Sequence, residues 1–176
     1  ALHMNLEKNI PVSSGLGSSG CSVVAAFMAL NEWYGRPFSP AELLKLMGQA
    51  EAKISGSLHY DNVAPSYLGG MQLMVQSGSD VTQKLPKLRG VYWVIAYPDV
   101  EVNTQAAREL LPESYPRETA IAFAQNLAGF VDACHRNDQV HAFDLMKDVV
   151  AEPFRAAIIP KFSEAKAQMI AMNSLA

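Results

Sequence analysis

Pro11-Val-Ser-Ser-Gly-Leu-Gly-Ser-Ser-Gly-Cys-Ser22 is a glycine- and serine-rich segment that leads directly into an apolar helical pattern. Its glycines at 15, 17 and 20 carry no Cβ, so the backbone can approach an anion closely. The first N–H groups of the following helix have no partner within the helix and lie at the positive end of its dipole. The segment therefore predicts a phosphate-binding loop. An ordinary capped helix after a flexible turn fits the loop alone equally well.

Two better-known phosphate motifs do not fit this loop. The spacing of Gly15, Gly17 and Gly20 matches a dinucleotide-binding fingerprint, but the stretch at 2–8 alternates apolar and polar residues. Such alternation predicts a strand with one wet face, whereas a parallel Rossmann strand is apolar throughout. In a P-loop, the position of Cys21 is occupied by the lysine that reaches the phosphates. If the loop binds phosphate, we therefore expect a phosphate cradle of a third kind.

Composition and charge exclude several classes of protein. The chain has 176 residues, of which 49% are hydrophobic and 18% charged, and its net charge is −3. An acidic balance argues against nucleic acid as a partner, and no apolar run approaches the length that spans a bilayer. Cys21 and Cys134 fit a reducing compartment, so we expect a cytoplasmic protein without a membrane partner. No Cys-x-x-Cys pair supports a zinc site.

Two helices are expected in the first half of the chain. The first covers about 18–31, immediately after the loop. The second covers about 40–53 and has a clear start: Ser39 suits the N-cap, Pro40 the first helical position, and Glu42 completes a capping box.

Glu51 and the segment that follows it are the candidates for chemistry. The carboxylate of Glu51 lies near the C-terminal end of the second helix, where the dipole disfavours it, so a bound cation or a solvated surface position would explain it. Residues 54–70 form a polar, turn-rich connection that places His59, Asp61 and Asn62 within four positions. Connections of this kind between firm elements often carry sites.

The second half begins after a hairpin or linker. Residues 68–75 predict a strand, 76–90 a linker or hairpin and the domain boundary, and 91–97 a strand with both faces largely covered. Helical patterns follow at 103–111, 118–136, 140–150 and 154–172, with Arg108 in the first and Arg155 at the start of the last. Either arginine, considered alone, is compatible with a solvated surface position. Few strands and several helices predict a mixed α+β fold.

These residues together resemble the GHMP small-molecule kinases, and within them the homoserine kinases. The resemblance begins with the loop, Pro11 to Gly20, and with Glu51. It continues through Ile-Ser-Gly-Ser at 54–57, His-Tyr-Asp-Asn-Val-Ala-Pro at 59–65 and Leu-Gly-Gly-Met at 68–71. In the second half it includes Val-Ile-Ala-Tyr-Pro at 94–98, the helix from Thr104 to Pro112, and Lys-Asp-Val-Val-Ala-Glu-Pro-Phe-Arg at 147–155. It covers essentially the whole chain.

The resemblance implies a two-domain fold. Residues 1–85 would form part of the N-terminal, ATP-binding domain, which is ribosomal S5 domain 2-like, and residues 86–176 part of a ferredoxin-like C-terminal domain. Homoserine kinases carry an upstream motif with Asn and Asp and a downstream Gly-Ser-Gly motif, and this sequence lacks both. We therefore expect both domains to be incomplete here, with an unpaired first strand and an unaccompanied last helix.

The resemblance also implies a reaction and a set of site residues. The reaction transfers the γ-phosphoryl group of ATP to the side-chain hydroxyl of L-homoserine, a step of threonine biosynthesis. The ATP phosphates would bind the loop residues Pro11, Val12, Ser13, Ser14, Gly15, Leu16, Gly17, Ser18, Ser19, Gly20 and Cys21. Ser19 and Glu51 would bind Mg²⁺, which takes hydroxyl and carboxylate oxygens.

Four residues are assigned to the substrate by the same resemblance. Asn62 would contact the substrate hydroxyl with His59 close to the same atom, while Arg108 and Arg155 would bind the substrate carboxylate. Asn62, His59 and Arg108 are thus the candidate catalytic residues. No general base emerges, since Asp61 is the nearest acidic residue and the family is thought to manage without one. Homodimer formation is an expectation from the family alone.

Two alternatives to a homoserine kinase stay open. One is another GHMP kinase that acts on a different small alcohol. The other is a non-catalytic, nucleotide-binding or folding piece of such a protein.

Overall fold

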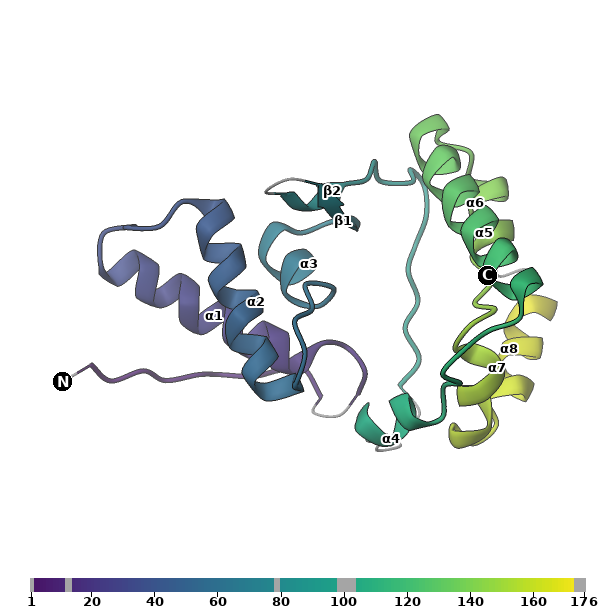
Figure 1. Ribbon diagram of the computed structural model, residues 1–176, viewed down its shortest axis with the longest axis horizontal. Helices are drawn as coiled ribbons and strands as arrows, with labels where there is room; N and C mark the ends of the chain where they lie inside the picture. The colour runs from purple at the N-terminus through teal and green to yellow at the C-terminus, as the bar shows by residue number, and fades with distance from the viewer. Residues whose placement is uncertain (1, 12–13, 78–79, 98–103, 173–176) are drawn as a thin grey trace. The chain divides into compact units, whose positions relative to one another are not determined.

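The computed structural model describes residues 2–11, 14–77, 80–97 and 104–172. These residues form a mixed fold with helices and one small sheet, which confirms the α+β class (Figure 1). The chain divides into two compact units, residues 1–85 and 86–176. The boundary lies inside the segment 76–90, and the assignment of the units to the two kinase domains stays a prediction.

Unit 1 contains three helices and a hairpin. They are α1 (Ser18–Trp33), α2 (Pro40–Ser55), α3 (Val63–Leu68), β1 (Gln72–Ser77) and β2 (Asp80–Lys84). The strands pair antiparallel, with Gln72 opposite Lys84 and Met74 opposite Thr82, so the hairpin expected in this region is present. β1 begins four residues later than predicted because Leu68 still belongs to α3. α3 lies within the expected turn-rich connection and has no counterpart among the predicted helices.

The start of α2 follows its sequence signal. The Ser39 hydroxyl accepts the Glu42 N–H at 3.4 Å, and the Glu42 carboxylate accepts the Ser39 N–H at 2.9 Å. Both halves of the capping box are therefore formed, with Pro40 as the first helical residue. The hydrogen bond from the Ser39 hydroxyl is also the main reason why the pKa of Glu42 is lowered.

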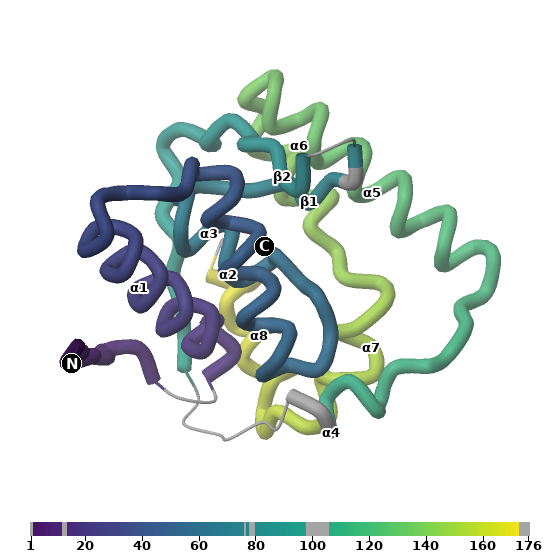
Figure 2. The backbone as a smooth tube through the Cα atoms, turned by 60° about the vertical axis from the view of Figure 1, so that its left-hand side comes forward, coloured from purple at the N-terminus to yellow at the C-terminus, as the bar shows by residue number. Residues whose placement is uncertain are grey.

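The three helices of unit 1 share one core (Figures 1 and 2). Met47 of α2 is fully buried at its centre. Around it lie Val23, Val24, Leu43, Leu44, Val63 and Ala64, with Phe27, Tyr60, Tyr67 and Val81 packed against the cluster. This packing holds the N-terminal end of α1 against the other two helices.

Unit 2 is helical in its described residues. Its elements are α4 (Thr104–Glu109), α5 (Arg117–Arg136), α6 (Gln139–Leu145), α7 (Glu152–Arg155), a 3₁₀ turn (Ala156–Ile158) and α8 (Phe162–Ala171). α5 and α6 pack side by side through Ala133, Cys134, Ala142 and Phe143. Burial raises the pKa of the Cys134 thiol, and both cysteines are free. The helix expected over 154–172 is interrupted around Pro160, which helix interiors exclude.

Two expected strands are wrong. Residues 2–8 and 91–97 form no ladder, and instead of two covered faces the second stretch has Tyr92 at 93% and Val94 at 77% exposed. A strand needs a neighbour to pair its backbone groups. Among the described residues of unit 2 there is no strand, so the β-branched and aromatic composition of 91–97 has nothing to pair with. No helix of the described residues is long and apolar enough to cross a membrane.

Truncation of a buried methionine should lower the free energy of unfolding more than truncation of an exposed one. Met47→Ala removes a fully buried side chain between three helices, and we expect it to lower the free energy of unfolding by about 2–5 kcal/mol. The control is Met28→Ala in α1, where the side chain is 48% exposed and the expected change is below about 0.5 kcal/mol. Urea unfolding followed by circular dichroism measures both, and equal losses would contradict this core.

Candidate active site

The loop before α1 turns sharply, and the backbone N–H groups that follow it have no partner within the helix. The Ser14 hydroxyl donates to Pro11 O at 2.8 Å, and Gly17, the N-cap of α1, has φ +69°, which favours glycine. The first hydrogen bond of α1 runs from Cys21 N–H to Gly17 O at 3.0 Å. The amides of residues 18–20 therefore precede the helical ladder and are available to an anion. Val12 and Ser13, two predicted loop residues, lie outside the described residues.

Ser19 and Glu51, the predicted metal ligands, are in direct contact. The Ser19 hydroxyl donates to Glu51 Oε2 at 3.0 Å across 32 residues of sequence. The Glu51 residue is only 7% exposed, so the solvated surface position considered from the sequence is wrong. The hydroxyl of Ser18 is buried without a hydrogen-bond partner among the described residues. A hydroxyl and a carboxylate, both hard oxygen ligands, thus meet at the start of α1.

These two donors suit Mg²⁺, which takes part of its ligands from phosphates and waters, better than a metal held by protein side chains alone. Within the described ranges, no Lys, Arg or His forms an ion pair with Glu51, and no group of three His, Cys, Asp or Glu could hold a metal by itself. A buried carboxylate without a counter-charge is costly. Mg²⁺ is usually bound by one or two protein oxygens together with substrate phosphates and waters. The pair therefore suits a cation that arrives with a phosphate.

Asn62 lies against the loop because two glycines make room for it. A Cβ at Gly17 would lie 2.9 Å from Asn62 Oδ1, and one at Gly20 would lie 3.0 Å from Asn62 Cβ. Asn62 immediately precedes α3, whose Val63 belongs to the core of unit 1. Two predictions made separately, the phosphate loop and the substrate-contacting Asn62, thus involve neighbouring residues in space.

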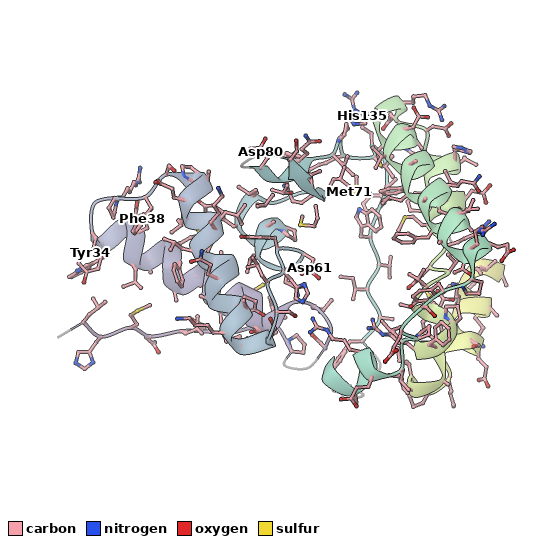
Figure 3. The ribbon with its side chains drawn as sticks, viewed as in Figure 1. Tyr34, Phe38, Asp61, Met71, Asp80 and His135 are labelled. Atoms are coloured by element: carbon pink, nitrogen blue, oxygen red, sulfur yellow. The ribbon has the colours of Figure 1, made fainter. Side chains whose placement is uncertain are left out.

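His59 and Asp61 lie on the segment between α2 and α3. His59 is half-buried, and its Nε2 lies 2.6 Å from the hydroxyl of Ser57. Asp61 is exposed, on the same segment (Figure 3). The Ser57 partner was not among the predicted residues. The only sequence signal for it is its position two residues before the histidine in a turn-rich segment.

Arg108 and Arg155 come from adjacent segments of unit 2. Arg155 Nε donates to the carbonyl of Ala107 at 2.9 Å, which places α7 beside the last turn of α4. That bond uses one of five guanidinium donors and leaves the others for an anion. Arg108 is exposed, and it follows Ala107 directly. Unit 2 therefore brings the two predicted carboxylate-binding arginines into one neighbourhood.

Asp148 fixes the start of the segment that carries Arg155. Its carboxylate accepts N–H groups from Val150 at 2.9 Å, Ala151 at 2.7 Å and Glu152 at 3.1 Å. Burial acts to raise the pKa of Asp148, but these hydrogen bonds and the charge of Arg155 outweigh it and lower the pKa. Asp148 is not among the predicted residues, although an Asp that can bind backbone N–H groups a few residues further on is a local signal.

Substitution of Gly20 should test the contact between the loop and Asn62. In an open helix position, Gly→Ala would raise stability, whereas here the new Cβ meets Asn62 at 3.0 Å. We expect Gly20→Ala to lower the free energy of unfolding by about 1–3 kcal/mol. The control is Ala25→Gly at an exposed position of α1, which measures how strongly this helix favours alanine over glycine. A gain in stability from Gly20→Ala would contradict the contact.

Removal of the Asp148 carboxylate should show a defined pH dependence. Because the folded pKa lies below the unfolded value, the charged carboxylate stabilises the fold above the unfolded pKa, and this stabilisation disappears as the pH falls through the folded pKa. We expect Asp148→Ala to be less stable than the parent at neutral pH, with the gap closing below about pH 4. Thermal unfolding across pH measures it. Asp144→Ala, which removes only an exposed ion pair with Lys147, should show no such gap.

Two comparisons with known proteins show what this chain resembles. Residues 1–70 match the GHMP kinases N terminal domain. The crystal structure of a homoserine kinase from Cytophaga hutchinsonii is similar to this chain with a TM-score of 0.85 and 34% sequence identity, covering 96% of this chain and 53% of that one. The chain thus spans about half the length of that homoserine kinase. Its first 70 residues are therefore similar to the GHMP kinase N-terminal domain, and the chain as a whole resembles part of a homoserine kinase.

Proposed function

We propose that this chain supplies the phosphate-binding and acceptor-binding parts of a kinase that transfers the γ-phosphoryl group of ATP to the side-chain hydroxyl of L-homoserine. The observation that carries the proposal is the contact between Ser19 at the start of α1 and the buried Glu51. It lies within the part of the chain that matches the GHMP kinase domain. The homoserine kinase relative supports the choice of acceptor.

Phosphoryl transfer requires positioning and charge neutralisation more than covalent chemistry. In the proposed reaction, the amides of residues 18–20 bind the phosphate oxygens, and Ser19 and Glu51 hold Mg²⁺. The cation would neutralise charge on the β- and γ-phosphates. Asn62, adjacent to the loop, would orient the acceptor hydroxyl by a hydrogen bond from its amide.

The carboxylate of the acceptor would be recognised by guanidinium groups of unit 2. Arg108 and Arg155 would bind the carboxylate of an amino acid, since the planar guanidinium fork matches a carboxylate. Two arginines suit an α-carboxylate with its fixed geometry. We propose no carboxylate base for the acceptor hydroxyl, because phosphoryl transfer through a loose transition state depends on positioning and charge stabilisation.

A ligand titration distinguishes this function from its alternatives. The melting temperature of the chain is measured with Mg-ATP, with L-homoserine, and with both, against L-homoserine's deoxy analogue 2-aminobutyrate as control. Stabilisation by both ligands supports the proposal. Stabilisation by Mg-ATP alone favours another alcohol, and no shift with either contradicts nucleotide binding by this chain. ADP release that depends on L-homoserine is the corresponding activity measurement.

Glu51→Gln should separate metal binding from nucleotide binding. It keeps an oxygen for the Ser19 hydroxyl but removes the charge, so Mg-ATP affinity should fall at least tenfold, about 1.4 kcal/mol. Affinity for ATP in EDTA should not fall, because the loop amides are untouched. Without ligand, the variant should be at least as stable as the parent, since a buried charge is removed.

The matched control is Glu7→Gln, which removes one exposed carboxylate of unit 1 and should change none of these values. Calorimetric titration measures the affinities. Equal Mg-ATP affinity in Glu51→Gln and the parent would exclude Glu51 as a metal ligand.

A further inference from the structure

The hydroxyl of Ser57 and the ring of His59 form a short hydrogen bond that the proposed function leaves unexplained. The Ser57 oxygen and His59 Nε2 are 2.6 Å apart. Bonds donated by N–H groups to oxygen usually measure about 2.7–3.2 Å, so this contact is shorter than an N–H donor on His59 would give. The length therefore favours the hydroxyl as donor and Nε2 as acceptor. In a neutral imidazole, the proton is then on Nδ1.

Both ends of the segment that carries this pair are attached to α2. At one end, the Ser55 hydroxyl lies 3.0 Å from both Glu51 O and Ser57 O, so it ties the Ser57 backbone to the last turn of the helix. The Gly56 N–H also donates to Ala52 O at 2.9 Å. The position of Ser57 is therefore set by the same helix turn that presents Glu51.

At the other end, the ring of Tyr60 lies directly on α2. A Cβ at Gly48 would come within 2.3 Å of Tyr60 Cε1, so only glycine allows this approach. The carbonyl of Tyr60 then accepts the Ala64 N–H at 2.8 Å and leads into α3. His59 thus lies between two fixed points, and its remaining freedom is rotation of the side chain, which the Ser57 bond restricts.

We infer that Ser57 is a positioning residue that holds His59 as a neutral imidazole with its proton on Nδ1. The part that this positioned imidazole plays in the reaction rests on the proposed function. With Nε2 occupied by the serine, Nδ1–H is the group His59 can offer to the acceptor hydroxyl or a phosphoryl oxygen. His59 then acts toward them as a hydrogen-bond donor and not as the base that removes the hydroxyl proton.

The protonated nitrogen can be observed directly in the chain without any ligand. Long-range ¹⁵N–¹H NMR of the imidazoles distinguishes a ring with the proton on Nδ1 from one with it on Nε2. Free histidine in water prefers Nε2, so the expected Nδ1–H form of His59 is a departure from the default. His141 serves as an internal reference, because its ring has no hydrogen bond with the described residues.

Substitution of the serine gives the decisive comparison. In Ser57→Ala, His59 should return to the mixture that His141 shows, whereas Ser57→Thr, which keeps the hydroxyl, should retain the Nδ1–H form. Ser66→Ala, which removes another exposed hydroxyl of unit 1, should leave His59 unchanged. An Nε2–H form of His59 in the parent, or an unchanged spectrum in Ser57→Ala, would overturn the inference.

Failure of the proposed function would look different. If neither Mg-ATP nor L-homoserine raises the melting temperature while His59 keeps its Nδ1–H form and loses it in Ser57→Ala, the positioning stands and the kinase assignment falls. If both ligands bind but the His59 spectrum does not depend on Ser57, the kinase assignment stands and the positioning falls.

Discussion

The first turn of α1 touches both other helices of unit 1, and the candidate site depends on these two contacts. Ser19 reaches Glu51 of α2, and Gly20 lies against Asn62 at the start of α3. The core around Met47 keeps these helices together. Because a bonded hydroxyl and a missing Cβ set the two contacts, the loop has little freedom to shift without disturbing one of them. The candidate site is therefore built from helix packing, and the loop supplies its amides and the Ser19 hydroxyl.

Features with local causes could be predicted from the sequence, and those with distant causes could not. The capping box of Ser39 and Glu42 is complete within four residues, so its pattern fixes the start of α2. The strand expected at 91–97 had the right composition, but pairing depends on a neighbour elsewhere in the chain. α3 was missed because Pro65 falls within a segment rich in turn residues, although proline is tolerated in the first helical turn.

The candidate site also combines a contact between residues far apart in the sequence with one between near neighbours. The contact between Ser19 and Glu51 spans 32 residues, and no periodicity predicts it; only the family resemblance joined the two residues. The bond between Ser57 and His59 spans two residues, yet it escaped notice because a serine near a histidine is common in turns. What distinguishes this pair is the anchoring of its segment at Ser55 and Tyr60, which depends on packing against α2.

The charges around Glu51 explain why nucleotide and cation should bind together. Glu51 lies near the C-terminal end of α2, where the helix dipole is unfavourable to a carboxylate, and it contacts the N-terminal turn of α1, where the dipole is favourable. A phosphate bound at that same turn would compete for the dipole and repel the carboxylate at close range. A divalent cation held by Glu51 would offset this repulsion. In the proposed kinase, the buried position of Glu51 would therefore make binding of ATP depend on Mg²⁺ far more strongly than an exposed carboxylate would.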